Sequence, residues 1–126
     1  MPVRTRRWCA PGAPDDGYRV LVTRYRPRGL PRAEETWDVW KKDLGPSAAL
    51  FAAFQGKGPG PALTLDAYRA RYLEEMGAQG EAIAELAARV DRGETVTLLC
   101  SKYCVIPAAC HRTLLAELVE AARARL

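Results

Sequence analysis

The stretch that most constrains this fold is residues 95–112, where a short apolar run leads through a loop into a helix. The run over 95–101 is aliphatic and partly β-branched and follows the helix stop Gly93, which is typical of a strand buried on both faces. Apolar residues then recur at helical spacing over 114–122, so we predict a helix whose first turn holds residues 110–112. The first N–H groups of a helix lack internal partners and lie at its positive dipole end, so this arrangement favours anion binding.

Three of the four cysteines and the only histidine lie in this stretch. In one interpretation Cys110 is a reactive cysteine, a nucleophile whose ionised form is favoured by the helix start and by Arg112. His111 would then transfer protons, and Arg112 and Cys100 would help to bind an anionic group. In the other interpretation the cysteines are small buried hydrophobes and His111 is a satisfied, half-buried side chain.

Length and composition indicate one domain over residues 1–126 of a globular protein. The chain is 48% hydrophobic and 27% charged, and it has no apolar run near the ~20 residues of a membrane span. The basic N-terminus is not followed by the apolar segment of a secretory signal, so we expect a cytoplasmic protein with reduced thiols and no membrane partner.

The net charge of +4 is concentrated in residues 1–32, which hold eight arginines against two aspartates. Clustered arginine favours phosphate or carboxylate ligands, because its planar fork donates two parallel hydrogen bonds. We therefore take Arg24 and Arg28 as candidate ligands of a small anion. Nucleic acid is an alternative partner, although the region lacks interleaved aromatic residues and any named motif, and a solvated basic surface is another.

The remaining pattern predicts an α/β fold, with a mainly parallel short sheet and a helical crossover. The predicted elements are a weak edge strand over 3–8, a strand over 18–24, helices over 33–44, 47–54, 64–76 and 81–92, the strand over 95–101 and the final helix. The helix over 33–44 is predicted from the spacing of Trp37, Trp40 and Leu44, which we expect to bury both tryptophans. Parallel pairing of strands 18–24 and 95–101 would bring Arg24, Arg28 and residues 100–112 to one crevice.

Residues spread over most of the chain match a known family pattern. They are Asp16–Val22, Arg24, Pro27–Leu30, Trp40, Pro46–Ser47, Phe54, Arg71–Tyr72, Thr97–Leu99 and His111. Cys100 with the run Cys110–Arg112 looks like the paired Cys and Cys-His-Arg signature of the wider family. On these residues the sequence resembles the bacterial family called domain of unknown function 488, in particular its YeaO-like branch. The resemblance implies an α/β fold and no established activity.

The chain departs from that branch at two places. The branch usually has Asp before the first Arg and Trp two residues after it, where this chain has Thr23 and Arg26. It also commonly has Asn before the shared His and no Arg after it, where this chain has Cys110 and Arg112. The resemblance therefore implies a shared site built on His111, with Arg24 and Arg28.

Several functions remain open at this point. The first is an enzyme acting on a small phosphate-like or nucleotide-like anion; the second is a module that binds the same ligands without turnover. The third is a metal site of Cys100, Cys104, Cys110 and His111, whose spacing is not one of the strong zinc patterns. Cys100 and Cys110 also qualify as a redox pair if their Cα atoms lie within ~7 Å. The sequence predicts no particular cofactor.

Overall fold

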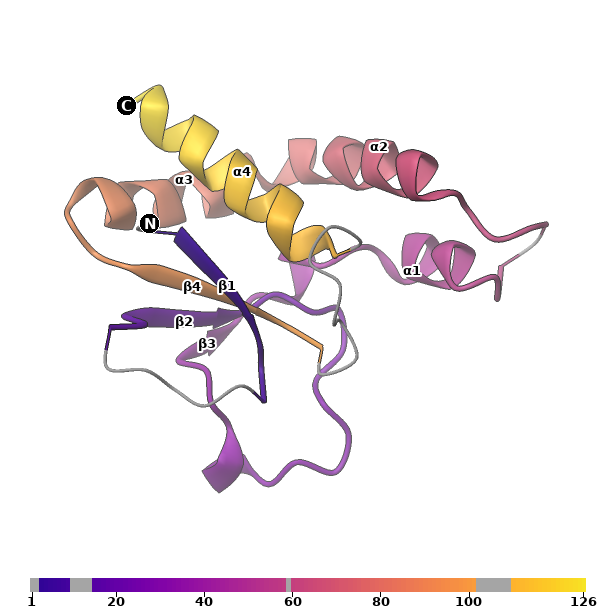
Figure 1. Ribbon diagram of the computed structural model, residues 1–126, viewed down its shortest axis with the longest axis horizontal. Helices are drawn as coiled ribbons and strands as arrows, with labels where there is room; N and C mark the ends of the chain where they lie inside the picture. The colour runs from indigo at the N-terminus through magenta and orange to yellow at the C-terminus, as the bar shows by residue number, and fades with distance from the viewer. Residues whose placement is uncertain (1–2, 10–14, 59, 102–109) are drawn as a thin grey trace.

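The computed structural model describes residues 3–9, 15–58, 60–101 and 110–126. Its centre is a four-stranded sheet in the order β1 (Val3–Arg7), β4 (Val96–Cys100), β2 (Tyr18–Leu21) and β3 (Val39–Trp40), shown in Figure 1. All three strand pairs are parallel, and β2 pairs directly with β4. The predicted α/β fold and the parallel pairing of the two apolar strands are confirmed.

The helices lie together on one side of this sheet (Figure 1). They are α1 (Ala48–Phe54), α2 (Leu65–Met76), α3 (Gly80–Asp91) and α4 (His111–Ala124), with a short 3-10 turn, η3 (Gly77–Gln79), between α2 and α3. Ser47 and Thr64 cap α1 and α2, accepting hydrogen bonds from the backbone N–H groups of Leu50 and Ala67. Among the described residues, no helix combines the length and the apolar character needed to cross a membrane.

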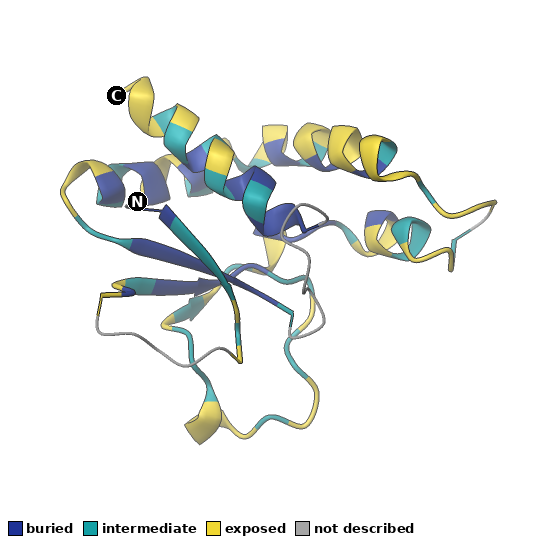
Figure 2. Cartoon of the chain, viewed as in Figure 1, coloured by how far each residue is buried: buried dark blue, intermediate teal, exposed yellow. Residues whose placement is uncertain are grey.

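The main core forms where these helices pack on the sheet (Figure 2). Successive strand residues point to opposite faces, so Val20 and Val22 share the helix-covered face with Val96 and Leu98. The helices contribute fully buried side chains to the same cluster, namely Tyr72, Leu86, Leu115 and Val119. Because β4 is central, all five of its residues are buried.

The other face of the sheet is covered by irregular segments. Arg19 and Thr97 are register partners on this face, and both are buried. The Arg19 side chain donates to the Thr36 carbonyl and pairs with the buried carboxylate of Asp16. The Thr97 hydroxyl donates to the Asp16 carbonyl at 2.7 Å. Asp16 therefore ties the segment before β2 to the middle of the sheet.

The helix predicted over 33–44 is wrong. The segment instead holds two 3-10 turns, η1 (Arg32–Glu34) and η2 (Lys42–Leu44), on either side of strand β3. Its backbone bonds go to β2, because Asp38 N–H donates to the Arg19 carbonyl and Lys41 N–H to the Leu21 carbonyl. The neighbouring strand thus supplies the bonds that a helix would make internally.

The burial of both tryptophans, expected from that helix, is also wrong. Trp40 is 37% exposed, and its indole N–H donates to the Thr23 carbonyl. Trp37 is half-buried and packs edge-to-face against Trp8, with ring centroids 6.4 Å apart. Tryptophan and valine suit a strand as well as an amphipathic helix, so the presence of β2 decides the outcome.

Candidate functional site

Two buried cysteines meet where β4 ends and α4 begins. Cys100 is the last residue of β4, and Cys110 occupies the N-cap position of α4, as the sequence predicts. Their sulfur atoms lie 3.0 Å apart, and each residue is only 4% exposed. Cys9 is exposed and follows Trp8, whose N–H donates to the Cys100 carbonyl, while Cys104 falls outside the described residues. The higher reactivity expected of Cys110 stays a prediction. Its burial limits the access of reagents to the sulfur atom.

His111 joins the start of α4 to the end of β2. Its Nε2 atom lies 2.7 Å from the carbonyl oxygen of Val22, the residue after β2. A carbonyl oxygen only accepts hydrogen bonds, so we assign the proton to Nε2. In the neutral ring the Nδ1 atom then carries the lone pair, and it lies 4.0 Å from Cys110 Sγ. The imidazole is thus held with its basic nitrogen toward the thiol.

Tyr72 of α2 forms one side of this cluster, and the sequence-based site did not include it. Its ring centroid lies 5.4 Å from that of His111, and its hydroxyl donates to the Leu44 carbonyl at 2.7 Å. Burial, followed by the nearby charges of Tyr68, Cys110 and Cys100, raises the pKa of Tyr72. The phenol therefore stays neutral and serves as a fixed wall beside the imidazole. The sequence predicts the helix over 64–76 that carries Tyr72, but the contact of Tyr72 with His111 depends on how α2 and α4 pack.

Arg112 is the second residue of α4 and is only 5% exposed. Within the part of the chain that the structure describes, neither its Nε nor its Nη1 atom has a hydrogen-bond partner. A guanidinium remains charged in proteins, and burying a charge without a partner costs several kcal/mol. Arg112 lies in the first turn of α4, at the positive end of the helix dipole.

Arg24 and Arg28 are placed differently from Arg112. All three guanidinium nitrogens of Arg24 have acceptors in the segment after β3: the carbonyls of Gly45 and Pro46 and the carboxylate of Asp43. Arg28 is exposed. The structure therefore groups Cys100, Cys110 and His111 and gives Arg24 a role in holding its own loop.

The arginine excess of the N-terminal third is largely used inside the fold. Among the described residues, the ion pairs are Arg4 with Asp15 and Asp16, Arg6 and Arg19 with Asp16, Arg24 with Asp43, and Arg26 with Glu35. Two of these acidic partners, Glu35 and Asp43, lie outside residues 1–32, so counting charges over that segment overstates its free positive charge. The basic composition alone therefore gives little support to nucleic acid as a partner.

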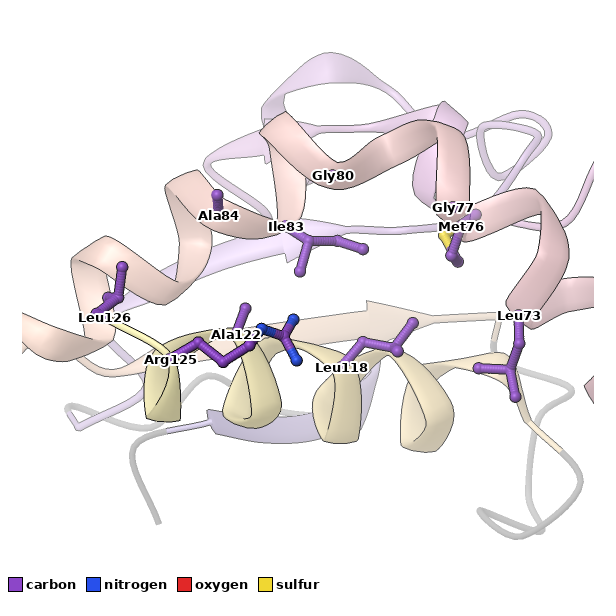
Figure 3. A pocket seen from close by; sticks show the side chains of 10 residues that line it. All are labelled: Leu73, Met76, Gly77, Gly80, Ile83, Ala84, Leu118, Ala122, Arg125 and Leu126. Atoms are coloured by element: carbon purple, nitrogen blue, oxygen red, sulfur yellow. The ribbon is translucent and has the colours of Figure 1, made fainter.

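A hollow in the described surface lies away from these residues, between α2, α3 and α4 (Figure 3). Its volume is about 400 Å³, and side chains such as Met76, Ile83 and Leu118 line it. Among the described residues, Cys100, Cys110, His111 and Arg112 do not contribute to its lining. The hollow and the thiol cluster are thus separate features.

The fold and the cluster together define a small parallel α/β domain with two thiols and an imidazole at the carboxyl ends of its strands. The chain belongs to the domain of unknown function 488 family. The sequence model of the group DUF488-N3a, described as the active DUF488-N3 subclade, matches residues 3–123. The resemblance seen in the sequence is confirmed.

Curated relatives agree with this assignment. The uncharacterized protein YeaO of Escherichia coli K12 is 34% identical over 101 residues, which cover 80% of this chain and 84% of YeaO. The uncharacterized protein Rv3073c of Mycobacterium tuberculosis H37Rv and Mb3100c of Mycobacterium bovis are each 30% identical over 106 residues, covering 84% of this chain and 83% of theirs. No solved structure matches the chain significantly.

Proposed function

We propose that this protein is a thiol-dependent enzyme acting on a small anionic substrate of the phosphate or nucleotide class. Cys110 is the nucleophile and His111 transfers its proton. Arg112 and the start of α4 bind the anionic group, and Cys100 supports the thiolate. The observation that carries the proposal is the buried Arg112 guanidinium, whose Nε and Nη1 atoms have no hydrogen-bond partner among the described residues, two residues from a thiol at a helix N-terminus.

The arrangement supports one sequence of proton and electron movements. His111 Nδ1 accepts the proton of the Cys110 thiol, and Nε2 continues to donate to the Val22 carbonyl. The thiolate attacks an electrophilic atom of the substrate, and the leaving group departs with the electron pair of the broken bond and takes the proton from His111. Water then cleaves the sulfur–substrate bond, and the Cys110 thiol is restored.

Cys100 and Arg112 contribute to the charge balance of these steps. Cys100 lies close enough to donate its S–H proton to the Cys110 sulfur when that sulfur is negative. Arg112 lies in the first turn of α4, where the positive end of the helix dipole favours the negative charge of a bound substrate. Arg24 is omitted from this proposal because its guanidinium holds the loop after β3. Arg28, which is exposed, remains a candidate for contacting the outer part of a substrate.

Two alkylating agents of similar size, anionic iodoacetate and neutral iodoacetamide, test the anion site at Cys110. Each would be applied to the folded protein, and labelling would be mapped by mass spectrometry, with exposed Cys9 as an internal reference. We expect the rate ratio of iodoacetate to iodoacetamide to be higher at Cys110 than at Cys9. Inorganic phosphate should slow iodoacetate labelling at Cys110 alone.

An Arg112→Gln variant should bring the ratio at Cys110 down toward that of Cys9. The matched control is Arg92→Gln, which removes the same charge from an exposed position. Equal ratios at both cysteines in the unmodified protein would contradict the anion site. Turnover requires a separate assay, in which the probe p-nitrophenyl phosphate should release its nitrophenol in the unmodified protein but not in Cys110→Ser. Phosphate protection without product release from phosphate or nucleotide probes would favour a binding module.

A metal centre is a second candidate, favoured by one observation. The ligand atoms of Cys100, Cys110 and His111 lie within 4.8 Å of one another, and Nε2 of the histidine is held by a backbone carbonyl, as in many metal sites. Two cysteines and one histidine can hold a catalytic zinc ion, but tetrahedral zinc separates its sulfur ligands by ~3.8 Å. The observed 3.0 Å is shorter. Elemental analysis of protein purified without chelator would support this candidate if zinc were present and lost in Cys110→Ser.

A further inference from the structure

The two buried sulfur atoms suggest a modification of the site as well as a reaction in it. We propose that Cys100 and Cys110 form a reversible disulfide on exposure to a small hydroperoxide, and that this bond switches the site off. The switching half of this inference rests on the proposed function, because it assumes that Cys110 is the nucleophile. The formation of the disulfide does not.

The distance between the sulfur atoms supports the proposal. A disulfide bond is ~2.05 Å long, so the observed 3.0 Å leaves a closure of about 1 Å. Both backbones are held in place on either side. The Cys100 carbonyl accepts a bond from Trp8 N–H at 2.7 Å, and the Cys110 carbonyl accepts one from Thr113 N–H at the start of α4. We infer that rotation of the two side chains closes the remaining distance.

The surroundings select the oxidant. Both cysteines are only 4% exposed, and hydrogen peroxide is a small, uncharged oxidant suited to such a buried pair. His111 Nδ1 lies 4.0 Å from Cys110 Sγ and can accept its proton, which makes Cys110 the first sulfur to react. Cys100 is then positioned as the resolving thiol.

The chemistry balances in two steps. The Cys110 thiolate attacks one peroxide oxygen, the O–O bond breaks, and the products are Cys110 sulfenic acid and hydroxide, which takes the proton held by His111 and leaves as water. The Cys100 sulfur then attacks the sulfenic sulfur, and the S–O bond breaks with release of a second water, formed from the hydroxyl group and the Cys100 proton. Two thiols are oxidised and one peroxide is reduced. The disulfide leaves no nucleophilic thiolate at Cys110.

The bond can be detected without any substrate. The folded protein would be treated with hydrogen peroxide, its free thiols blocked, and the chain digested with trypsin under non-reducing conditions. Cleavage after Arg92, Lys102 and Arg112 places Cys100 in peptide 93–102 and Cys110 in peptide 103–112. We expect these peptides to be linked. Because 103–112 also contains Cys104, fragment spectra and a Cys104→Ser variant must show that the link uses Cys110.

The expected results separate this inference from the proposed function. The link should persist in Cys104→Ser and Cys9→Ser, disappear in Cys100→Ser, and be reversed by dithiothreitol. In Cys100→Ser, peroxide should instead convert Cys110 to the sulfinic form, which dithiothreitol does not reverse. A link from Cys100 to Cys104, or no link in the folded protein, would overturn the redox inference and leave the iodoacetate result standing.

The switch has its own readout. Peroxide should abolish iodoacetate labelling at Cys110 in the unmodified protein, and dithiothreitol should restore it in full. In Cys100→Ser the same peroxide treatment should cause a loss that dithiothreitol does not restore. Labelling at Cys110 that continues in the linked protein would overturn the switch. If the Cys100–Cys110 disulfide forms but Cys110 does not prefer iodoacetate to iodoacetamide, the result contradicts the anionic substrate and still supports the redox pair.

Discussion

Replacing Tyr72 with Phe removes one hydroxyl group and leaves the ring that packs beside His111. Tyr72 has no exposed surface and Leu44 is 1% exposed, so the carbonyl that accepts the tyrosine hydrogen bond is buried with it. Leaving a buried acceptor without its donor costs about 1–3 kcal/mol of the free energy of unfolding. At roughly 2.1 cal/mol/K per residue for the entropy of unfolding, this lowers the Tm of a 126-residue chain by about 4–11 °C.

Calorimetry of the reduced protein provides the measurement, and Tyr25→Phe is the matched control. Tyr25 is 58% exposed, so removing its hydroxyl should change the free energy of unfolding by no more than about 0.5 kcal/mol. Because the ring of Tyr72 is kept, the labelling ratio at Cys110 should not change. If the two variants were equally stable, the bond from Tyr72 to Leu44 would not stabilise the fold, and the reasoning would be refuted.

The same side chain predicts how stability changes at high pH. Burial raises the pKa of Tyr72 above its usual value of about 10, whereas in the unfolded chain it ionises near that value. Above pH ~10 the unfolded state therefore binds fewer protons than the folded state. Tyr72 then contributes a fall in the free energy of unfolding of up to ~1.4 kcal/mol per pH unit. In Tyr72→Phe this contribution should be absent. Denaturant unfolding of both proteins across this pH range measures how the free energy of unfolding changes with pH, and the same pH dependence in both would contradict the assignment.

Two further predictions concern the segment before β2. Gly17→Ala should lower the free energy of unfolding more than Gly29→Ala. Both glycines have positive φ angles, 65° and 72°, so the backbone strain of the two substitutions is similar. Only at Gly17 would the new Cβ atom overlap a backbone carbonyl, that of Thr95. Denaturant unfolding of both variants measures the difference, and equal losses would show that this close approach is relaxed in solution. Asp16→Asn should lower the free energy of unfolding by roughly 3 kcal/mol or more, because it leaves the buried Arg19 guanidinium uncompensated. The exposed Asp15→Asn is its control and should lose less than about 1 kcal/mol, so similar losses in both would contradict the importance of burial.

Local patterns in the sequence were enough to predict much of the framework. The apolar run that forms β4 needs a buried central position wherever the chain places it, and α4 follows from its own apolar repeat. Ser47 and Thr64 cap their helices through bonds to residues three positions later, which a linear sequence shows directly. The meeting of Cys100 and Cys110 also follows from local order, because the end of a strand and the start of the next helix lie at the same edge of the sheet.

The segment over 33–44 shows why local patterns were insufficient elsewhere. Trp37 and Trp40 fit both a helix and a strand, and the hydrogen bonds that favour the strand come from β2, about twenty residues earlier. Arg24 shows the same limit for function. Its clustering with other arginines indicated an anion site, whereas its guanidinium is held by Asp43 and two carbonyls that the sequence does not place near it.

The composition of the thiol cluster likewise depended on tertiary structure. The sequence placed Cys110, His111 and Arg112 at a helix start, but it did not show that Tyr72 would pack against the imidazole or that the Val22 carbonyl would fix its protonated nitrogen. Nor did it distinguish Arg112 as a buried cation whose Nε and Nη1 atoms have no hydrogen-bond partner among the described residues. Residue type and spacing determine which groups lie on one element. Which nitrogen of His111 faces the thiol, and which arginine keeps guanidinium nitrogens without a hydrogen-bond partner among the described residues, depend on contacts between elements far apart in the chain. Only packing creates those contacts.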